Sequence, residues 1–236
     1  MSELNTYQKA INYLKANDYT LAIVSFTEAL EQGYSDRNLH YYLAICYANL
    51  NYHNEALEEI ELAFKEDLEF SVKLQLLHLK GYILFLQNKN EEALKVFEEA
   101  LEYDAHNQIT ISSIGYYYYK SGVYDKALKY YEKAYKMTPD AAKTMNNYGY
   151  MLTLTQKDIK RGLELCENAL KKNPNSAAIL DSCGWANFLL NKITNATAFI
   201  TKAVKLDKNN ISEIKEHYSK IAAKVREIIS KDKEKK

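Results

Sequence analysis

The 236-residue sequence has little proline and little glycine, with 2 and 7 residues respectively. Both numbers are low for a loop-rich or all-β protein, whose many turns need these residues. No stretch approaches the roughly 18 apolar residues that a membrane-spanning helix needs. With 47% hydrophobic and 26% charged residues, the chain has enough apolar side chains for a buried core. The composition therefore predicts one or two ordinary domains without a membrane span.

A secretory signal and a cysteine framework are also absent from the sequence. The start, MSELNTYQKAINYL, has no basic n-region, apolar h-region or cleavage site. Cys46, Cys166 and Cys183 are odd in number and lack CxxC spacing. No histidine or activating setting lies near them, so buried free thiols are the favoured interpretation. These features predict a cytoplasmic protein.

No pattern of catalytic or metal-binding residues stands out. The five histidines are scattered without ligand spacing. The sequence contains no Gly-rich phosphate loop, no GxSxG and no HExxH. Acidic pairs such as Glu58–Glu59 and Glu98–Glu99 fit solvated helix faces. We therefore predict a protein that is not an enzyme, with no catalytic residue, no cofactor and no metal.

The formal net charge is zero, but the two signs are separated along the chain. Residues 1–107 have 8 Lys and Arg against 18 Asp and Glu, a net of −10. Residues 108–236 have 23 against 13, a net of +10. Such a split can steer partners or stack copies acidic end to basic end. An ordinary solvated surface with uneven composition explains it equally well.

A repeat of about 34 residues organises most of the sequence. Fragments such as DYTLAIVSFTEAL, NKNEEALKVFEEAL and GVYDKALKYYEKAY align on a small residue that is followed seven places later by alanine. Another small residue lies twelve or thirteen places before the first. Six copies thus have three positions that are always Gly or Ala. These are Ala10, Ala22, Ala29; Ala44, Ala56, Ala63; Gly81, Ala93, Ala100; Gly115, Ala127, Ala134; Gly149, Gly162, Ala169; and Gly184, Ala196, Ala203.

Each copy predicts two amphipathic helices, because its apolar residues recur three and four apart. Small residues on facing helices let the two backbones approach closely. A larger residue at Gly149 or Ala127 should force the pair apart, at about 1–3 kcal/mol. Pro139 and Pro174 each lie twelve residues after the middle small position and should stop the second helix.

The small-residue pattern, the apolar spacing, the two prolines and the period together resemble the tetratricopeptide repeat family. The resemblance covers about residues 3–210 and implies an all-α, right-handed α-solenoid of six helix-turn-helix repeats. The departures are three residues inserted before the third copy, one in the turn of the fifth, and Thr6 and Lys9 where the family usually has large apolar residues. The implied repeats are about 3–36, 37–70, 74–107, 108–141, 142–176 and 177–210.

A further helix is predicted over residues 211–230. One apolar stripe runs along it, made of Ile211, Ile214, Tyr218, Ile221, Val225 and Ile228. A helix of this kind commonly ends such arrays, where it caps the last apolar face. Capping is the favoured role, and folding back into the groove as an inhibitor is the alternative. Residues 231–236, KDKEKK, are predicted to be a charged disordered tail.

In this family the first helix of each pair lines a concave surface. The implied register places nine candidate partner-binding residues there: Tyr41, Tyr82, Phe85, Tyr116, Tyr119, Asn146, Tyr150, Trp185 and Phe188. Within the run of four tyrosines, Tyr118 should pack between helices and Tyr117 against the neighbouring repeat. Aromatic rings bury a large area at little rotamer entropy, and tyrosine keeps a polar group. For any single ring, packing in the inner core is the alternative.

The predicted function is a protein–protein interaction scaffold or adaptor that binds a peptide or helix of a partner in an aromatic-lined concave groove. The alternative is a structural protein that self-assembles through its oppositely charged halves, so a homo-oligomer is left open. Some family members hold a chaperone's C-terminal carboxylate, but only Lys143, Asn146 and Asn147 match parts of that clamp. Nucleic acid is not expected as a partner, because the basic residues fall mainly on second helices and turns, away from the rings.

Overall fold

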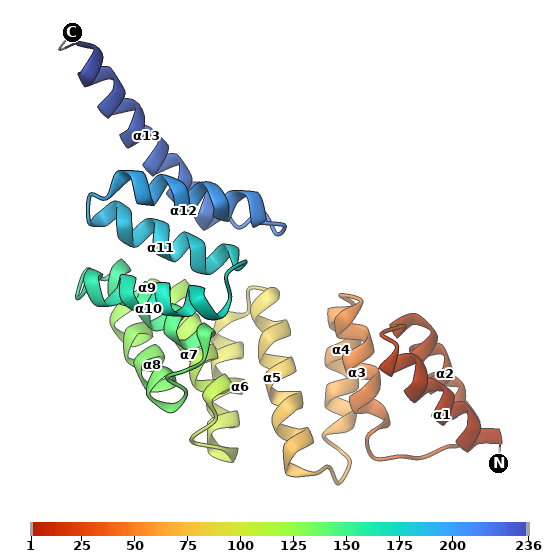
Figure 1. Ribbon diagram of the computed structural model, residues 1–236. Helices are drawn as coiled ribbons and strands as arrows, with labels where there is room; N and C mark the ends of the chain where they lie inside the picture. The colour runs from red at the N-terminus through yellow and green to blue at the C-terminus, as the bar shows by residue number, and fades with distance from the viewer. Residues whose placement is uncertain (1, 235–236) are drawn as a thin grey trace. The chain divides into compact units, whose positions relative to one another are not determined.

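The computed structural model of the protein describes residues 2–234, and the side chains of residues 5–231. All the regular elements in this part of the chain are α-helices (Figure 1). They are α1 (Ser2–Lys15), α2 (Tyr19–Glu31), α3 (Leu39–Asn49), α4 (His53–Ala63), α5 (Phe70–Leu86), α6 (Asn90–Tyr103), α7 (Gln108–Lys120), α8 (Tyr124–Met137), α9 (Ala142–Leu154), α10 (Ile159–Lys172), α11 (Ala177–Leu189), α12 (Ile193–Leu206) and α13 (Ser212–Glu234). The predicted all-α class is therefore confirmed.

The chain forms two compact units, Met1–Thr110 and Ile111–Lys236, so that α7 begins in the first and continues in the second. Consecutive helices pair within each unit, as the contacts of α1 with α2 and of α11 with α12 show. Each pair then packs on the next, for example α2 on α3 and α10 on α11. Pro139 and Pro174 each lie two residues beyond the end of a second helix, α8 or α10. At these places proline interrupts no hydrogen bond within a helix.

The small residues of the repeat are the points where paired helices touch. All eighteen are buried, and each alanine among them exposes at most 1% of its surface. The approach is closest between α9 and α10. A Cβ built on Gly149 would lie 2.8 Å from the carbonyl oxygen of Gly162, and one on Gly162 would lie 2.6 Å from that of Gly149. Here backbone packs directly on backbone, which only glycine permits.

Each turn inside a helix pair contains one residue with a positive φ, in the left-handed region. These residues are Asn17, Asn51, Asn88, Gly122, Gln156 and Asn191. Glycine reaches this region freely, and asparagine reaches it more readily than most residues. Gln156, at φ 54°, is the exception and lies in the turn that carries the inserted residue. The polar breaks in the sequence thus supply the conformation that reverses the chain.

The three residues inserted before the third copy lengthen a helix. α5 begins at Phe70, ahead of the predicted start at 74, and is 17 residues long. The ring of Phe70 packs against Tyr103 of α6, with centroids 5.9 Å apart, and the preceding Leu68 is buried. The insertion is therefore accommodated as additional helix with its own contacts rather than as a loop.

The last helix caps the second unit. Ile214 and Ile221 of α13 are buried in a cluster with Leu180, Ala196 and Ile200. α13 continues to Glu234, four residues past its predicted end and into the predicted tail. Ion pairs of Glu227 with residues three before and four after it support the helix there. Residues 235 and 236 of the predicted tail lie outside the described residues.

The cysteines agree with their interpretation from the sequence. Cys46, Cys166 and Cys183 are free and buried. Burial raises the pKa of the Cys46 and Cys183 thiols to about 12, so both stay protonated at neutral pH. Along the stretch that the structure describes, no helix is both long and apolar enough to cross a membrane.

Two alanine substitutions at the same repeat position test the backbone contact. We expect Gly149→Ala to lower the free energy of unfolding by about 1–3 kcal/mol, because the new methyl group meets a carbonyl oxygen that cannot move alone. Gly184→Ala is the matched control, since its Cβ would come no closer than 3.3 Å to another atom. It should lose less stability than Gly149→Ala, because its closest contact is looser and alanine favours helix over glycine by about 1 kcal/mol. Urea unfolding followed by circular dichroism measures both, and equal losses would contradict this account.

Candidate partner-binding site

The rings of the four-tyrosine run on α7 enter different surroundings. Tyr118 stacks on Tyr130 of α8, with centroids 5.5 Å apart, and contributes to the core beside α8. Tyr116 keeps 44% of its surface exposed. Tyr119 is half-buried and meets Tyr150 of α9 edge to face, at 5.9 Å between centroids. The run therefore serves both a core and an accessible surface.

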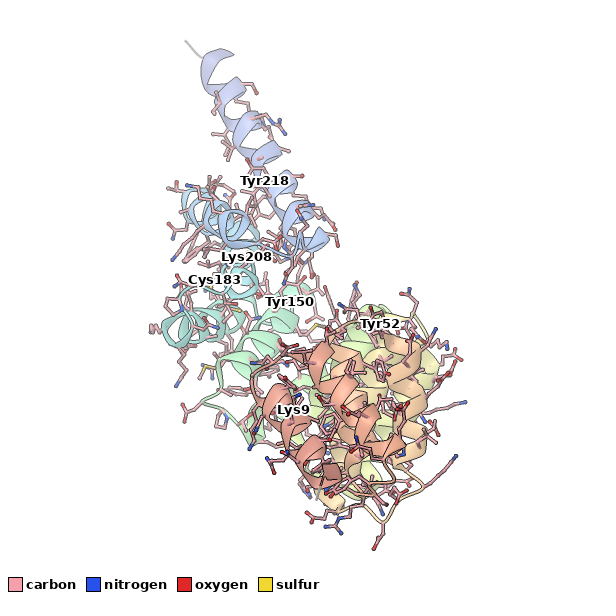
Figure 2. All side chains as sticks on the ribbon, turned by 90° about the vertical axis from the view of Figure 1, so that its right-hand side faces the viewer. Lys9, Tyr52, Tyr150, Cys183, Lys208 and Tyr218 are labelled. Atoms are coloured by element: carbon pink, nitrogen blue, oxygen red, sulfur yellow. The ribbon has the colours of Figure 1, made fainter. Side chains whose placement is uncertain are left out.

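A carboxylate of the last helix holds Tyr119 and Tyr150 together. Glu213 of α13 accepts a hydrogen bond from the hydroxyl of each tyrosine. Burial, assisted by the charge of Glu213, raises the pKa of both phenols well above the ordinary value. Both hydroxyls are therefore protonated donors at neutral pH. Tyr150 is labelled in Figure 2.

A second polar contact joins α13 to α11. Nδ1 of His217 lies 2.9 and 3.0 Å from the two carboxylate oxygens of Asp181, and each side chain is only 6% exposed. The imidazole also stacks on the indole of Trp185, 4.2 Å between centroids and 11° between planes. Lys220 Nζ lies 5.4 Å from the centroid of the same indole, a cation–π contact. Burial raises the pKa of Asp181, while the hydrogen bond with His217 opposes this rise.

Asp181, Glu213 and the two tyrosines that Glu213 holds line a cavity of about 210 Å³ in the second unit. We call it the tyrosine cavity, and its polar and aromatic lining includes Tyr116, Tyr119, Asn146, Tyr150, Asp181 and Glu213. Oδ1 of Asn146 is buried and has no hydrogen-bond partner among the described residues. The cavity thus combines aromatic walls, two carboxylates and one amide oxygen that lacks a donor.

The structure gathers only part of the predicted set of site residues. Four of them, Tyr116, Tyr119, Asn146 and Tyr150, line the tyrosine cavity. Trp185 and Phe188 stack on each other at 5.2 Å, and His217 covers the Trp185 face. Tyr41, Tyr82 and Phe85 belong to the first unit. Their predicted alignment with the rings of the second unit stays a prediction.

Within the first unit these three residues differ in accessibility. Tyr82 exposes 58% of its surface, and Phe85 is half-buried. The hydroxyl of Tyr41 donates a hydrogen bond to Gln75 of α5, the first helix of the following pair. Tyr41 therefore helps to join two repeats, whereas Tyr82 is open to contact.

Glu213, His217 and Lys220 are the residues of this site that sequence reasoning missed. These three polar residues are four and three places apart, so they share one face of α13. They form a second stripe beside the isoleucines, and this spacing was the signal that could have found them. The two roles left open for this helix, capping and entry into the predicted groove, do not exclude each other. Its isoleucines cap the core, and its polar stripe contacts Tyr119, Tyr150, Asp181 and Trp185.

The Asp181–His217 pair makes a pH-dependent prediction. His217→Ala should lower the free energy of unfolding by about 3–5 kcal/mol at neutral pH, because it leaves the Asp181 carboxylate buried without its partner. Burial raises the Asp181 pKa above the unfolded value of about 3.9. Above this raised pKa, the charged Asp181 carboxylate destabilises the folded state. As the pH falls from the raised pKa toward about 4, Asp181 takes up a proton and this destabilisation disappears. In acid, the stability that His217→Ala loses should shrink to the part that comes from the missing packing on Trp185.

The control is the double variant Asp181→Asn plus His217→Ala, which buries no charge. It should lose less stability than His217→Ala at neutral pH and should not show the recovery in acid. Urea unfolding of the three proteins across this pH range measures the effect. A loss in His217→Ala that is the same at every pH would show that the carboxylate is not the cause.

Comparison with known proteins places the chain in a family. Family models described as tetratricopeptide repeat match residues 7–67, 74–107 and 113–177. The chain is 26% identical over 155 residues to a TPR repeat-containing protein of Pseudomonas aeruginosa, covering 64% of this chain and 25% of the relative. It is 25% identical over 166 residues to the Hsp70-Hsp90 organizing protein of Triticum aestivum, covering 70% and 26%. The chain spans between 18% and 40% of the length of the curated relatives it matches.

Solved structures agree on the fold. The C-terminal part of a TPR repeat-containing protein from Cytophaga hutchinsonii matches with a TM-score of 0.71 and 20% identity, covering 97% of this chain and 90% of that one. YrrB, described as a TPR protein with an unusual peptide-binding site, matches with a TM-score of 0.56 and 20% identity, covering 74% and 88%. Identities this low show the fold alone. Because the family models match more than half of the chain, it belongs to the tetratricopeptide repeat family, and its fold is the all-α helical-repeat solenoid of that family.

Proposed function

We propose that the protein is a protein–protein interaction scaffold and that the tyrosine cavity binds a segment of its partner. Members of the family generally mediate protein–protein interactions and are typically non-enzymatic. YrrB is described as a TPR protein with an unusual peptide-binding site, and the Triticum aestivum relative is named Hsp70-Hsp90 organizing protein. Both descriptions fit a role in which this chain holds other proteins.

The observation that carries this proposal is the buried amide oxygen of Asn146 without a donor. A buried polar group left unpaired costs about 1–3 kcal/mol. Once the Asn146 side chain turns toward the cavity, the backbone N–H of an extended segment entering it would supply the missing donor. The neighbouring rings of Tyr116 and Tyr150 would then pack against the side chains of that segment.

The size of the cavity favours a peptide over a metabolite. About 210 Å³ is less than the roughly 300–1,000 Å³ of typical small-molecule sites. This space suits a side chain or two of a longer segment, the remainder of which lies along the exposed surface beside Tyr116. Tyr41, Tyr82 and Phe85 stay proposed partner-binding residues of the first unit by itself.

The charge of the cavity indicates which segments it accepts. Its charged lining residues are both acidic, Asp181 and Glu213. Glu213 already accepts two tyrosine hydroxyls, and a further carboxylate beside it would be repelled. This supports the sequence interpretation that a chaperone's carboxylate terminus is disfavoured. We expect apolar segments that carry lysine or arginine.

A selection from random linear peptides displayed on phage, with the full chain immobilised, tests the proposal. The selected peptides should carry a basic residue beside apolar ones. The double variant Tyr116→Ala plus Asn146→Ala should bind them at least about tenfold more weakly, a loss of about 1.4 kcal/mol. Fluorescence anisotropy of a labelled selected peptide measures the dissociation constant.

Tyr103→Ala is the matched control, because Tyr103 is a tyrosine of the first unit with 41% exposure, close to the 44% of Tyr116. It should leave peptide affinity unchanged. Peptides that bind wild type and the double variant equally would place the binding site elsewhere. Selection of peptides with acidic C-termini would contradict the expected charge preference.

A further inference from the structure

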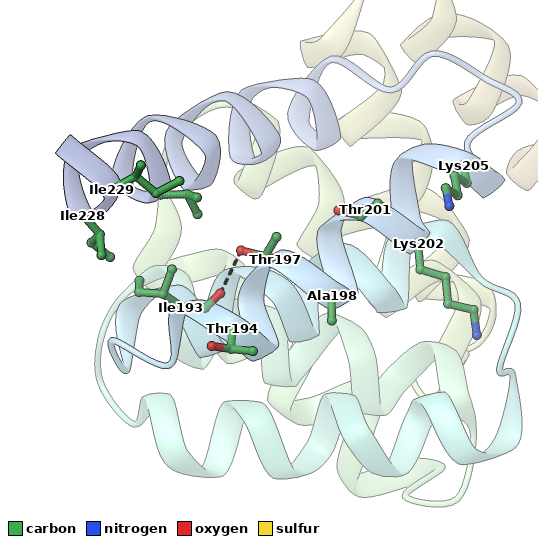
Figure 3. A pocket seen from close by; sticks show the side chains of 10 residues that line it. Ile193, Thr194, Thr197, Ala198, Thr201, Lys202, Lys205, Ile228 and Ile229 are labelled. Carbon is green, nitrogen blue, oxygen red and sulfur yellow. Dashed lines mark hydrogen bonds between the residues drawn. The ribbon is translucent and has the colours of Figure 1, made fainter. Parts of the chain in front are cut away.

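A groove of about 650 Å³ runs between α12 and the C-terminal part of α13 (Figure 3). One end is apolar, where Ile193 of α12 lies near Ile228 and Ile229 of α13. Ile228 and Ile229 expose 38% and 51% of their surface. At the other end Lys202 and Lys205 line the groove, and small residues such as Ala198 lie between the two ends. The groove therefore changes from apolar to basic along α12.

The repeat gives a precedent for a helix packed at the apolar end of this groove. Ile159 and Leu163 of α10 lie 34 residues before Ile193 and Thr197 of the groove, and they pack in one cluster with Phe199 of the next second helix, α12. α13 occupies the place of the first helix of a further pair. Within the described residues no second helix follows it. The apolar end of the groove is thus the place against which the second helix of another pair would pack.

One second helix of this protein has a face that fits. α2 buries Ala22, Phe26 and Ala29 in the first unit. Its opposite side exposes Leu21 and Val24, by 43% and 58%, followed by the exposed Glu28 and Glu31. These four residues share one helix face, because they are separated by three, four and three positions. We call it the outer face of α2, and it changes from apolar to acidic along the helix.

We propose that copies of this protein associate head to tail, with the outer face of α2 of one copy seated in the α12–α13 groove of another. When α2 runs parallel to α12, Leu21 and Val24 meet the isoleucine end, and Glu28 and Glu31 meet Lys202 and Lys205. The lengths agree at a rise of about 1.5 Å per residue. Leu21 to Glu31 spans about 15 Å and Ile193 to Lys205 about 18 Å.

The direction and the charges support a second copy as the occupant. Helices joined by short turns alternate in direction, so successive second helices run the same way, and α2 would enter as such a helix. The first unit has 8 basic and 18 acidic residues, and the second has 23 and 13. This opposition steers the first unit of one copy toward the second unit of another. Each copy offers one face of each kind, so the contact is heterologous and repeats from copy to copy.

Single substitutions at exposed positions test both faces. Wild type should show a mass that rises with concentration beyond a dimer in sedimentation velocity at low salt. Val24→Asp places a carboxylate on the apolar part of the outer face of α2, and Ile229→Asp places one at the apolar end of the groove. Each variant alone should therefore be monomeric. Val204→Asp is the matched control, because Val204 is 41% exposed on α12 and does not line the groove. It should associate like wild type.

A mixing experiment distinguishes this contact from others. Equal amounts of Val24→Asp and Ile229→Asp should form a dimer that does not grow, because one intact face of each kind remains. Loss of association in Ile229→Asp but not in Val24→Asp would indicate groove-to-groove pairing and would overturn the proposal. So would a monomeric wild type at every concentration, or a mixture that stays monomeric.

Charge reversal gives an independent result. Lys202→Glu plus Lys205→Glu should weaken association, as should Glu28→Lys plus Glu31→Lys, and a mixture of the two should recover it. Association of wild type should weaken at 1 M salt, where the Debye length is about 3 Å. The variant Tyr116→Ala plus Asn146→Ala should associate normally, because neither residue lines this groove. Failure of self-association and failure of peptide binding are therefore separable.

Discussion

The close contact of paired helices at glycine and alanine is the constraint on which the rest of the structure depends. Where α9 meets α10, each glycine lies against the carbonyl of the other, so no side chain separates the backbones. Contact this close permits few rotations of either helix about its axis, because any turn brings a larger side chain into the gap. Once the rotation is fixed, the direction of every other side chain on the helix is fixed as well. The exposure of Tyr116 and the packing of Tyr118 on α8 follow from the position of Gly115 beside them.

The last helix adds a different kind of contact. Its isoleucines bury apolar surface in a cluster of the second unit, and such contacts tolerate small shifts. Glu213 and His217 do not, because each must reach particular oxygen or ring atoms on α7, α9 and α11. Removing a carboxylate from water is unfavourable unless its partners are in place. The polar stripe therefore selects one placement of α13 among those that the isoleucines alone would allow.

That placement makes α13 line two separate cavities. Near its start, Glu213 and Ile214 form part of the wall of the tyrosine cavity. Near its end, Val225, Ile228 and Ile229 form one side of the α12–α13 groove. One helix thus contributes to an acidic, aromatic cavity suited to a peptide and to a partly basic groove suited to a helix. Because the two sites differ in charge, the proposed peptide partner and the proposed second copy would bind at different places on α13.

The sequence by itself determined the helices, their pairing and the contact points, because these depend on residues that recur within one repeat. Asparagine or glycine in five of the six turns and Gly or Ala at eighteen buried positions are local signals that periodicity reveals. Only the tertiary structure decided that Glu213 meets Tyr119, 94 residues away, and that His217 meets Asp181. An apolar stripe predicts which face of α13 is buried, but polar partners depend on the angle and depth at which the helix docks. Those are set by the summed packing of α11, α12 and α13, which no single repeat contains.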